Sequence, residues 1–66
     1  MRCTVNGEIQ ELPDDLTVGG LIDRLGLTGS ICAAEIDREL VPKSQRDVRV
    51  LRDGESVEIV TLVGGG

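Results

Sequence analysis

The residues best suited to chemistry in this sequence are its last three, Gly64-Gly65-Gly66. A run of glycines is flexible and thin enough for its backbone to enter a narrow enzyme tunnel. Its reactive group would be the α-carboxylate of Gly66, with Gly64 and Gly65 as the residues that an enzyme recognises behind it. A carboxylate is a poor electrophile until it is activated, for example as an acyl-adenylate made from ATP. We therefore interpret the tail as a substrate for other proteins. The alternative is that these glycines are a disordered end or an expression remnant.

The rest of the sequence offers no general base, metal-ligand set or oxyanion hole that we can identify. Among its 66 residues there is no His, the commonest acid–base group and metal ligand. Cys3 and Cys32 are far apart and lack CxxC or zinc-ligand spacing. We interpret both cysteines as small core residues in a reducing cytoplasm. We predict no catalytic residue and no metal site.

The charge balance favours a partner with a basic docking surface. Twelve acidic residues oppose seven basic ones, and there is no Phe, Tyr or Trp on which a base could stack. An acidic surface repels nucleic-acid phosphates, so nucleic acid is not an expected partner. The sequence shows no signal peptide and no apolar stretch long enough to span a membrane. We expect a soluble, cytoplasmic protein.

A hairpin and a helix are predicted in the first half of the chain. Asn6-Gly7 is typical of a tight turn between strands at residues 1–6 and 8–12. Thr17 is the predicted N-cap of a helix that ends at Gly26. Apolar residues on one helix face follow a spacing of i, i+3, i+4 and i+7: Val18, Leu21, Ile22 and Leu25. Gly19 and Gly20 weaken this helix, so we expect them to allow close packing against the sheet or to mark a frayed first turn.

The second half of the chain is predicted to return to the sheet. Strands are expected at 31–36, 40–41, 48–51 and 56–63, with turns at 37–39 and 52–55 and an irregular segment, one helical turn at most, at 42–46. The last strand is apolar on both faces, as a central strand is. The order predicts an α+β domain of two layers, a mixed sheet of about four to five strands with one main helix on one face.

Alternation along the last strand predicts a docking surface beside the tail. If Val57, Ile59 and Val63 face the helix, Val60 and Leu62 face outward. Exposed apolar residues next to a reactive terminus would suit a partner. The alternative is that neighbouring strands or side chains cover them.

Several sequence blocks spread along the chain are typical of one protein family, and the last of them is the most specific: Val5-Asn6-Gly7-Glu8, Leu16-Thr17-Val18 with Leu21-Ile22, Glu35-Ile36-Asp37-Arg38, Leu40-Val41-Pro42-Lys43, Arg52-Asp53-Gly54-Glu55, Val57-Glu58-Ile59-Val60 and Val63-Gly64-Gly65-Gly66. In these blocks the whole chain resembles the ThiS family, the sulfur carriers of thiamin biosynthesis. Many relatives carry a tryptophan shortly after the Val-Pro, where this sequence has Ser44-Gln45-Arg46. That departure concerns packing and partner choice, while the tail chemistry is untouched.

The resemblance implies a β-grasp (ubiquitin-like) domain at 1–63, with the last strand parallel to the first, and a flexible tail at 64–66. It implies that a ThiF-type enzyme adenylates Gly66 with ATP and magnesium, neither of which the carrier itself binds. Sulfur from a cysteine desulfurase, carried as a persulfide, would replace AMP and give a thiocarboxylate. A thiazole synthase of the ThiG type would receive that sulfur. The carrier would be a monomer when free and no enzyme in its own right.

Three other functions are compatible with these sequence features. The chain could serve molybdopterin synthesis or another sulfur pathway, although the molybdopterin subunit is usually longer. It could be a ubiquitin-like modifier that attaches Gly66 to lysines of other proteins. It could also be an interaction domain whose tail has no role.

Overall fold

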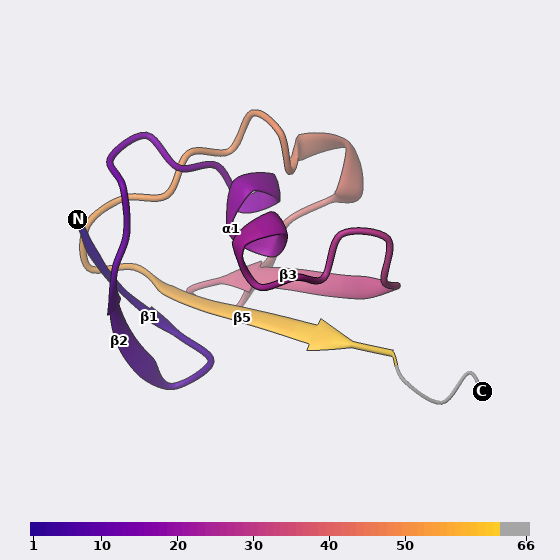
Figure 1. Cartoon of the computed structure of the whole chain (residues 1–66), viewed down its shortest axis with the longest axis horizontal. Coiled ribbons are helices and arrows are strands. Elements are labelled where there is room, and N and C mark those ends of the chain that lie inside the picture. Colours follow the sequence, from indigo (N-terminus) through magenta and orange to yellow (C-terminus); the bar gives the residue numbers. More distant parts are fainter. Residues whose placement is uncertain (63–66) are drawn as a thin grey trace.

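The computed structural model describes residues 1–62. Within that range the elements are a hairpin, a helix, a second hairpin, a short 3₁₀ helix and a final strand. In chain order they are β1 Arg2–Val5, β2 Glu8–Glu11, α1 Val18–Arg24, β3 Cys32–Ile36, β4 Glu39–Leu40, η1 Lys43–Gln45 and β5 Ser56–Thr61. The sheet has five strands in the order β2-β1-β5-β3-β4, and α1 lies on one face of it (Figure 1). This confirms the predicted α+β architecture.

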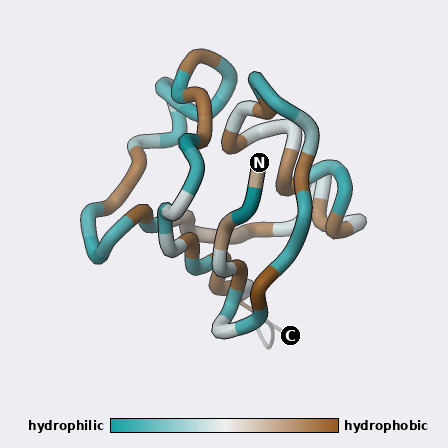
Figure 2. Tube along the Cα trace, turned by 90° about the vertical axis from the view of Figure 1, so that its left-hand side faces the viewer, coloured by the Kyte–Doolittle hydropathy of each residue, from teal (hydrophilic) through white to brown (hydrophobic). Residues whose placement is uncertain are grey.

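The last strand lies at the centre of the sheet, as its composition predicts. β5 is parallel to β1, with Thr4 opposite Ser56, and antiparallel to β3, with Ala33 opposite Val60. Figure 1 shows β5 running along the long axis of the molecule and ending away from the N-terminus. Figure 2 shows hydrophobic and hydrophilic residues alternating along the chain, as expected for strands that bury only one face.

Three local signals act as predicted. Asn6 and Gly7 have φ of 49° and 83°, the left-handed conformation that a two-residue hairpin turn requires. The Thr17 hydroxyl accepts a hydrogen bond from the Gly20 amide at 3.0 Å, so it caps α1. Gly26 follows the helix with φ of 74°. The helix has only seven residues, so it needs packing against the sheet as well as the cap to be stable.

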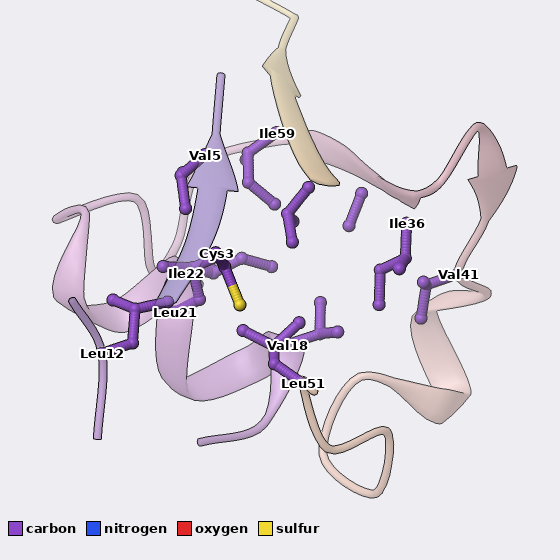
Figure 3. Packing of buried hydrophobic residues seen from close by; sticks show 12 residues of the cluster. Cys3, Val5, Leu12, Val18, Leu21, Ile22, Ile36, Val41, Leu51 and Ile59 are labelled. Atoms are coloured by element: carbon purple, nitrogen blue, oxygen red, sulfur yellow. The ribbon is translucent and has the colours of Figure 1, made fainter. Parts of the chain in front are cut away.

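The buried core lies between α1 and the sheet (Figure 3). It contains twelve residues: Cys3, Val5, Leu12, Val18, Leu21, Ile22, Ala34, Ile36, Val41, Leu51, Val57 and Ile59. Every residue of this core is aliphatic or a thiol, because the sequence has no aromatic side chain. Small, branched side chains fill the narrow space between one short helix and a twisted sheet.

The predicted strand at 48–51 is wrong. That segment makes a single bridge, between Val50 and Thr17, flanked by hydrogen bonds from the Leu51 amide to the Leu16 carbonyl (2.8 Å) and from the Val18 amide to the Arg49 carbonyl (2.9 Å). The pairing ends there because its partner segment becomes α1 at Val18. The apolar residues of this segment indicated a strand, but Val48 is exposed and only Leu51 reaches the core.

The second hairpin also differs in detail from the prediction. Its turn is two residues long, Asp37-Arg38, and β4 begins at Glu39 rather than at Leu40. Both turn residues have positive φ, 49° and 72°, although neither is glycine. The other strands begin or end one or two residues inside their predicted limits.

The nearest neighbours of the two glycines of α1 do not belong to the sheet, so the first of their two predicted roles, close packing against the sheet, is wrong. A Cβ on Gly19 would lie 2.5 Å from a carboxylate oxygen of Asp47 and 3.4 Å from the Arg46 carbonyl oxygen. A Cβ on Gly20 would lie 2.7 Å from a methyl carbon of Leu16. The two glycines therefore let the segments on either side of the Thr17–Val50 bridge approach the first turn of the helix.

Candidate functional site

The predicted reactive residues, Gly64, Gly65 and Gly66, lie outside the described residues, and so does Val63. The domain boundary predicted at 63 falls there as well. The structure does describe the part of the sheet from which the chain continues toward them, ending at Leu62. The geometry of the site is therefore that of the final residues of β5 and their neighbours.

Hydrogen bonds fix β5 along its whole described length. The β1 ladder ends at Val5, where the chain turns, and the Asn6 side chain takes over by accepting a hydrogen bond from the Ile59 amide at 2.8 Å. On the other edge, the Leu62 amide donates to the Ile31 carbonyl at 2.9 Å. The chain is thus held to the sheet up to its last described residue.

An apolar patch surrounds this end of β5 on the sheet face that α1 leaves open. We name it the tail-side patch, and its residues are Ile31, Ala33, Val60 and Leu62. Val60 is 50% exposed, Leu62 66% and Ile31 72%. Ala33 is half-buried and lies opposite Val60 in the ladder. Three exposed apolar side chains and the half-buried Ala33 thus lie on one sheet face at the end of β5.

The structure confirms that Val60 and Leu62 face outward and that Val57 and Ile59 are buried. The docking role of Val60 and Leu62 stays a prediction. Sequence reasoning placed Ile31 in a strand but did not connect it with Leu62. That connection depends on strand register, and no pattern within either segment gives the register between two residues that are 31 positions apart.

The two thiols differ in surroundings. Cys3 is 1% exposed, its Sγ lies 3.3 Å from the Arg52 carbonyl oxygen, and its side chain points into the core (Figure 3). Burial raises the pKa of the Cys3 thiol above its ordinary value, so the reactive thiolate is disfavoured. Cys32 is half-buried at the rim of the core rather than within it, because it lies at the start of β3. The prediction of two core cysteines is confirmed for Cys3 and wrong in part for Cys32.

Among residues 1–62 no group of three or more His, Cys, Asp or Glu side chains is arranged to hold a metal ion. No helix in that range is long and apolar enough to cross a membrane.

The sequence model of the ThiS family matches residues 2–66, a range that includes the glycine tail. The chain belongs to the ThiS family.

A solved structure agrees with that family, and another protein is similar in sequence. The crystal structure of the thiamine biosynthesis protein ThiS from Geobacter metallireducens superposes with a TM-score of 0.83 over the full length of both chains, at 28% identity. The superposition confirms the β-grasp fold. An uncharacterized protein of Porphyra purpurea, ycf40, is 32% identical over 62 residues, which are 94% of this chain and 87% of that protein.

A thiazole synthase of Paramagnetospirillum magneticum is 36% identical to all 66 residues of this chain. The chain spans 20% of the length of that protein. The similarity therefore concerns one segment of a longer polypeptide that carries the name of an enzyme.

Proposed function

We propose that this ThiS-family chain carries sulfur at the C-terminal carboxyl group of Gly66. A ThiF-type enzyme transfers AMP from ATP, with magnesium, to that carboxylate and releases pyrophosphate. The outer sulfur of a persulfide supplied by a cysteine desulfurase takes the place of AMP, and a thiol reductant releases the thiocarboxylate. The thiocarboxylate then donates its sulfur to a thiazole synthase.

The observation that carries the proposal is the position of the tail-side patch. Its apolar side chains surround the point from which the chain continues toward Gly64, and hydrogen bonds to Asn6 and Ile31 keep that point fixed relative to the sheet. A partner that docks on the patch would hold the tail at a set distance from its own catalytic residues. The carrier then needs no catalytic group, because positioning a bound substrate is itself a large part of catalysis.

The similarity to a thiazole synthase supports the choice of acceptor. In the Paramagnetospirillum magneticum protein, a segment like this chain and the rest of the polypeptide are covalently joined. Joining two partners raises their effective concentration and is useful where they act on each other. We infer that this chain contacts a thiazole synthase.

The direct test is intact-mass analysis after incubation with the activating enzyme of the same organism, ATP, magnesium and a sulfur source. The expected product has one oxygen of the chain replaced by sulfur, located at Gly66 by fragmentation. A variant that lacks Gly65 and Gly66 is the matched control and should remain unmodified. Absence of both adenylate and thiocarboxylate on the full chain would contradict the proposal. Conjugates to other proteins in cell extract would favour the modifier function instead.

Docking is tested by a pair of substitutions on the same sheet face. Leu62→Asp places a charge in the tail-side patch, whereas Ile9→Asp places one on β2, where Ile9 is 71% exposed and lies across the sheet from the patch. We expect Leu62→Asp to weaken binding to the activating enzyme at least about tenfold, because an interface core excludes unpaired charge. Ile9→Asp should bind as the wild type does. Equal affinities for the two variants would remove the patch from the interface.

A further inference from the structure

A surface hollow lies beside the point where β5 ends. It has a volume of about 620 Å³, within the range of roughly 300–1,000 Å³ that ligand clefts occupy, and it is lined by residues of α1 and of the segments 27–33 and 40–47. Ile31 belongs to this lining as well as to the tail-side patch, and its carbonyl accepts the hydrogen bond from the Leu62 amide at 2.9 Å. The last described residue of the chain is therefore one hydrogen bond away from the rim of the hollow.

The hollow is richer in positive than in negative charge. Lys43 and Arg46 line it, and Asp47 is the one acidic residue that the described part of the chain contributes to its lining. Neither Lys43 nor Arg46 forms an ion pair within residues 1–62. The chain as a whole carries a net charge of -5, so this hollow is a place where an otherwise acidic molecule favours an anion.

The Arg46 guanidinium has more donors than its neighbours satisfy. Its Nη2 donates to the Cys32 carbonyl oxygen at 2.5 Å, and its Nη1 donates to the Cys32 Sγ, a weak acceptor, at 3.8 Å. The buried Nε has no hydrogen-bond partner among residues 1–62. A buried donor without an acceptor is destabilising, and a carboxylate offers a guanidinium two strong acceptor oxygens. A carboxylate is therefore the group whose chemistry fits Arg46 in this hollow.

We propose that in the free carrier this hollow receives the chain's own glycine tail, with the Gly66 carboxylate on the Arg46 guanidinium. Cys32, to which Arg46 is bonded, lies opposite Thr61 in the ladder of β3 and β5. The tail then has to cross about two strand spacings, roughly 10 Å, and the four residues 63–66 span up to about 13 Å when extended. Such a path turns back across the start of β3, and glycines adopt the backbone conformations of a tight turn without a Cβ clash. The proposal rests on the proposed function in one point, that the carboxyl group of Gly66 ends the chain.

Docking of the tail and docking of a partner exclude each other in this arrangement, because Ile31 serves both. A partner that covers the tail-side patch also covers Ile31, and so it takes one wall of the hollow away from the tail. Gly66 is then released beside the docked partner, whereas in the free carrier its carboxylate stays paired with a cation. The hollow thus withholds the reactive carboxyl group from enzymes that do not dock on the patch.

The test follows the Gly66 amide in the free full chain by ¹⁵N relaxation in NMR. We expect an order parameter above about 0.6, the value below which a backbone is flexible, and a fall below that value in Arg46→Gln. Arg24→Gln removes an exposed cation of α1 outside the hollow, so it is the charge-matched control and should leave the order of Gly66 unchanged. A chain that ends in a Gly66 carboxamide keeps Arg46 and its contacts, so it tests the pairing even if Arg46→Gln does not fold. Its Gly66 amide should also fall below about 0.6.

Cys32 gives a second measurement, because its half-buried side chain lines the hollow, whereas Cys3 is 1% exposed. Removal of Gly65 and Gly66 should raise the rate at which iodoacetamide alkylates Cys32 at least about threefold, since reactivity follows exposure. Cys3 is the slowly reacting reference within the same chain. An unchanged rate at Cys32 would contradict a tail that covers the hollow.

The relaxation outcomes separate the occupants of the hollow. A flexible Gly66 amide in the wild type overturns the proposal, as does an amide that stays ordered in the carboxamide chain. Order that disappears on dilution assigns the hollow to the tail of a second copy and overturns the proposal as well. All of these measurements use the free carrier without enzyme or ATP, so they decide the docking of the tail separately from the thiocarboxylate that tests the proposed function.

Discussion

The two faces of the sheet have opposite uses, and β5 contributes to both. On the face covered by α1, Val57 is fully buried and Ile59 is 6% exposed. On the open face of the same strand, Glu58 and Val60 are exposed, and Val60 is as apolar as its buried neighbours. The alternation of side chains along a strand separates the two sets of residues by a single position. One strand of six residues can therefore hold the fold together and present a surface to a partner.

The strongest test of this comparison is a matched pair of truncations on β5. Ile59→Ala should destabilise the fold by about 2–5 kcal/mol, because it leaves a cavity against α1. Val60→Ala, one residue further, should change stability by less than about 0.5 kcal/mol, since its side chain is half exposed. Urea unfolding of both variants measures the difference. Similar losses would mean that the open face is covered in solution.

The two glycines of α1 are expected to differ in how well they tolerate an added methyl group. Gly20→Ala should destabilise by about 1–3 kcal/mol, because the new methyl meets Leu16, which packs against the core. Gly19→Ala should be neutral or stabilising by up to about 1 kcal/mol, because exposed Asp47 can move aside and alanine favours the helix. Thermal unfolding followed by circular dichroism distinguishes the two. A destabilising Gly19→Ala would show that the Arg46 carbonyl, 3.4 Å away, limits the approach.

At the edge of the open face, relief of backbone strain should raise stability. Arg38→Gly should stabilise the fold by about 0.5–1 kcal/mol, because glycine adopts φ of 72° without a Cβ clash and the gain exceeds its entropic cost. Gly54→Arg, the reverse change at a turn glycine with φ of 88°, should destabilise it. The denaturation midpoints of the two variants are the measurement. Loss of stability in Arg38→Gly would show that the Arg38 side chain contributes to the fold.

The smallest expected effect concerns pH and the buried thiol. Burial raises the pKa of Cys3 above its ordinary value of 9.0, so the folded state keeps this proton at pH values where the unfolded chain releases it. Stability from this group is therefore full below pH 9 and falls as pH rises through the folded pKa. We expect a lower urea midpoint at pH 10 than at pH 8 under reducing conditions. Cys3→Ala should be less stable at both pH values but show a smaller fall, and an identical fall would assign the effect to another group.

Local sequence signals predicted most of the elements because their causes are local. Asn6-Gly7 marks a turn through its backbone preference, and Thr17 marks a helix start through one side-chain hydrogen bond. The strand predicted at 48–51 failed for a non-local reason, since its pairing depends on where α1 begins. Gly19 was assigned to the wrong neighbour for the same reason, because the segment that approaches it, Arg46-Asp47, is nearly 30 residues away.

The sequence by itself determined the β-grasp order of elements, the apolar final strand and the absence of histidine and aromatic chemistry. It also determined the glycine tail on which the proposed sulfur chemistry depends. Only the tertiary structure decided which side chains meet across strands: Ile31 with Leu62, and Glu35 with Glu58. Hydrophobic periodicity says which face of a strand is buried, but register is set by the packing of the whole sheet. Surfaces for partners are assembled from several strands, so they appear only once that register is known.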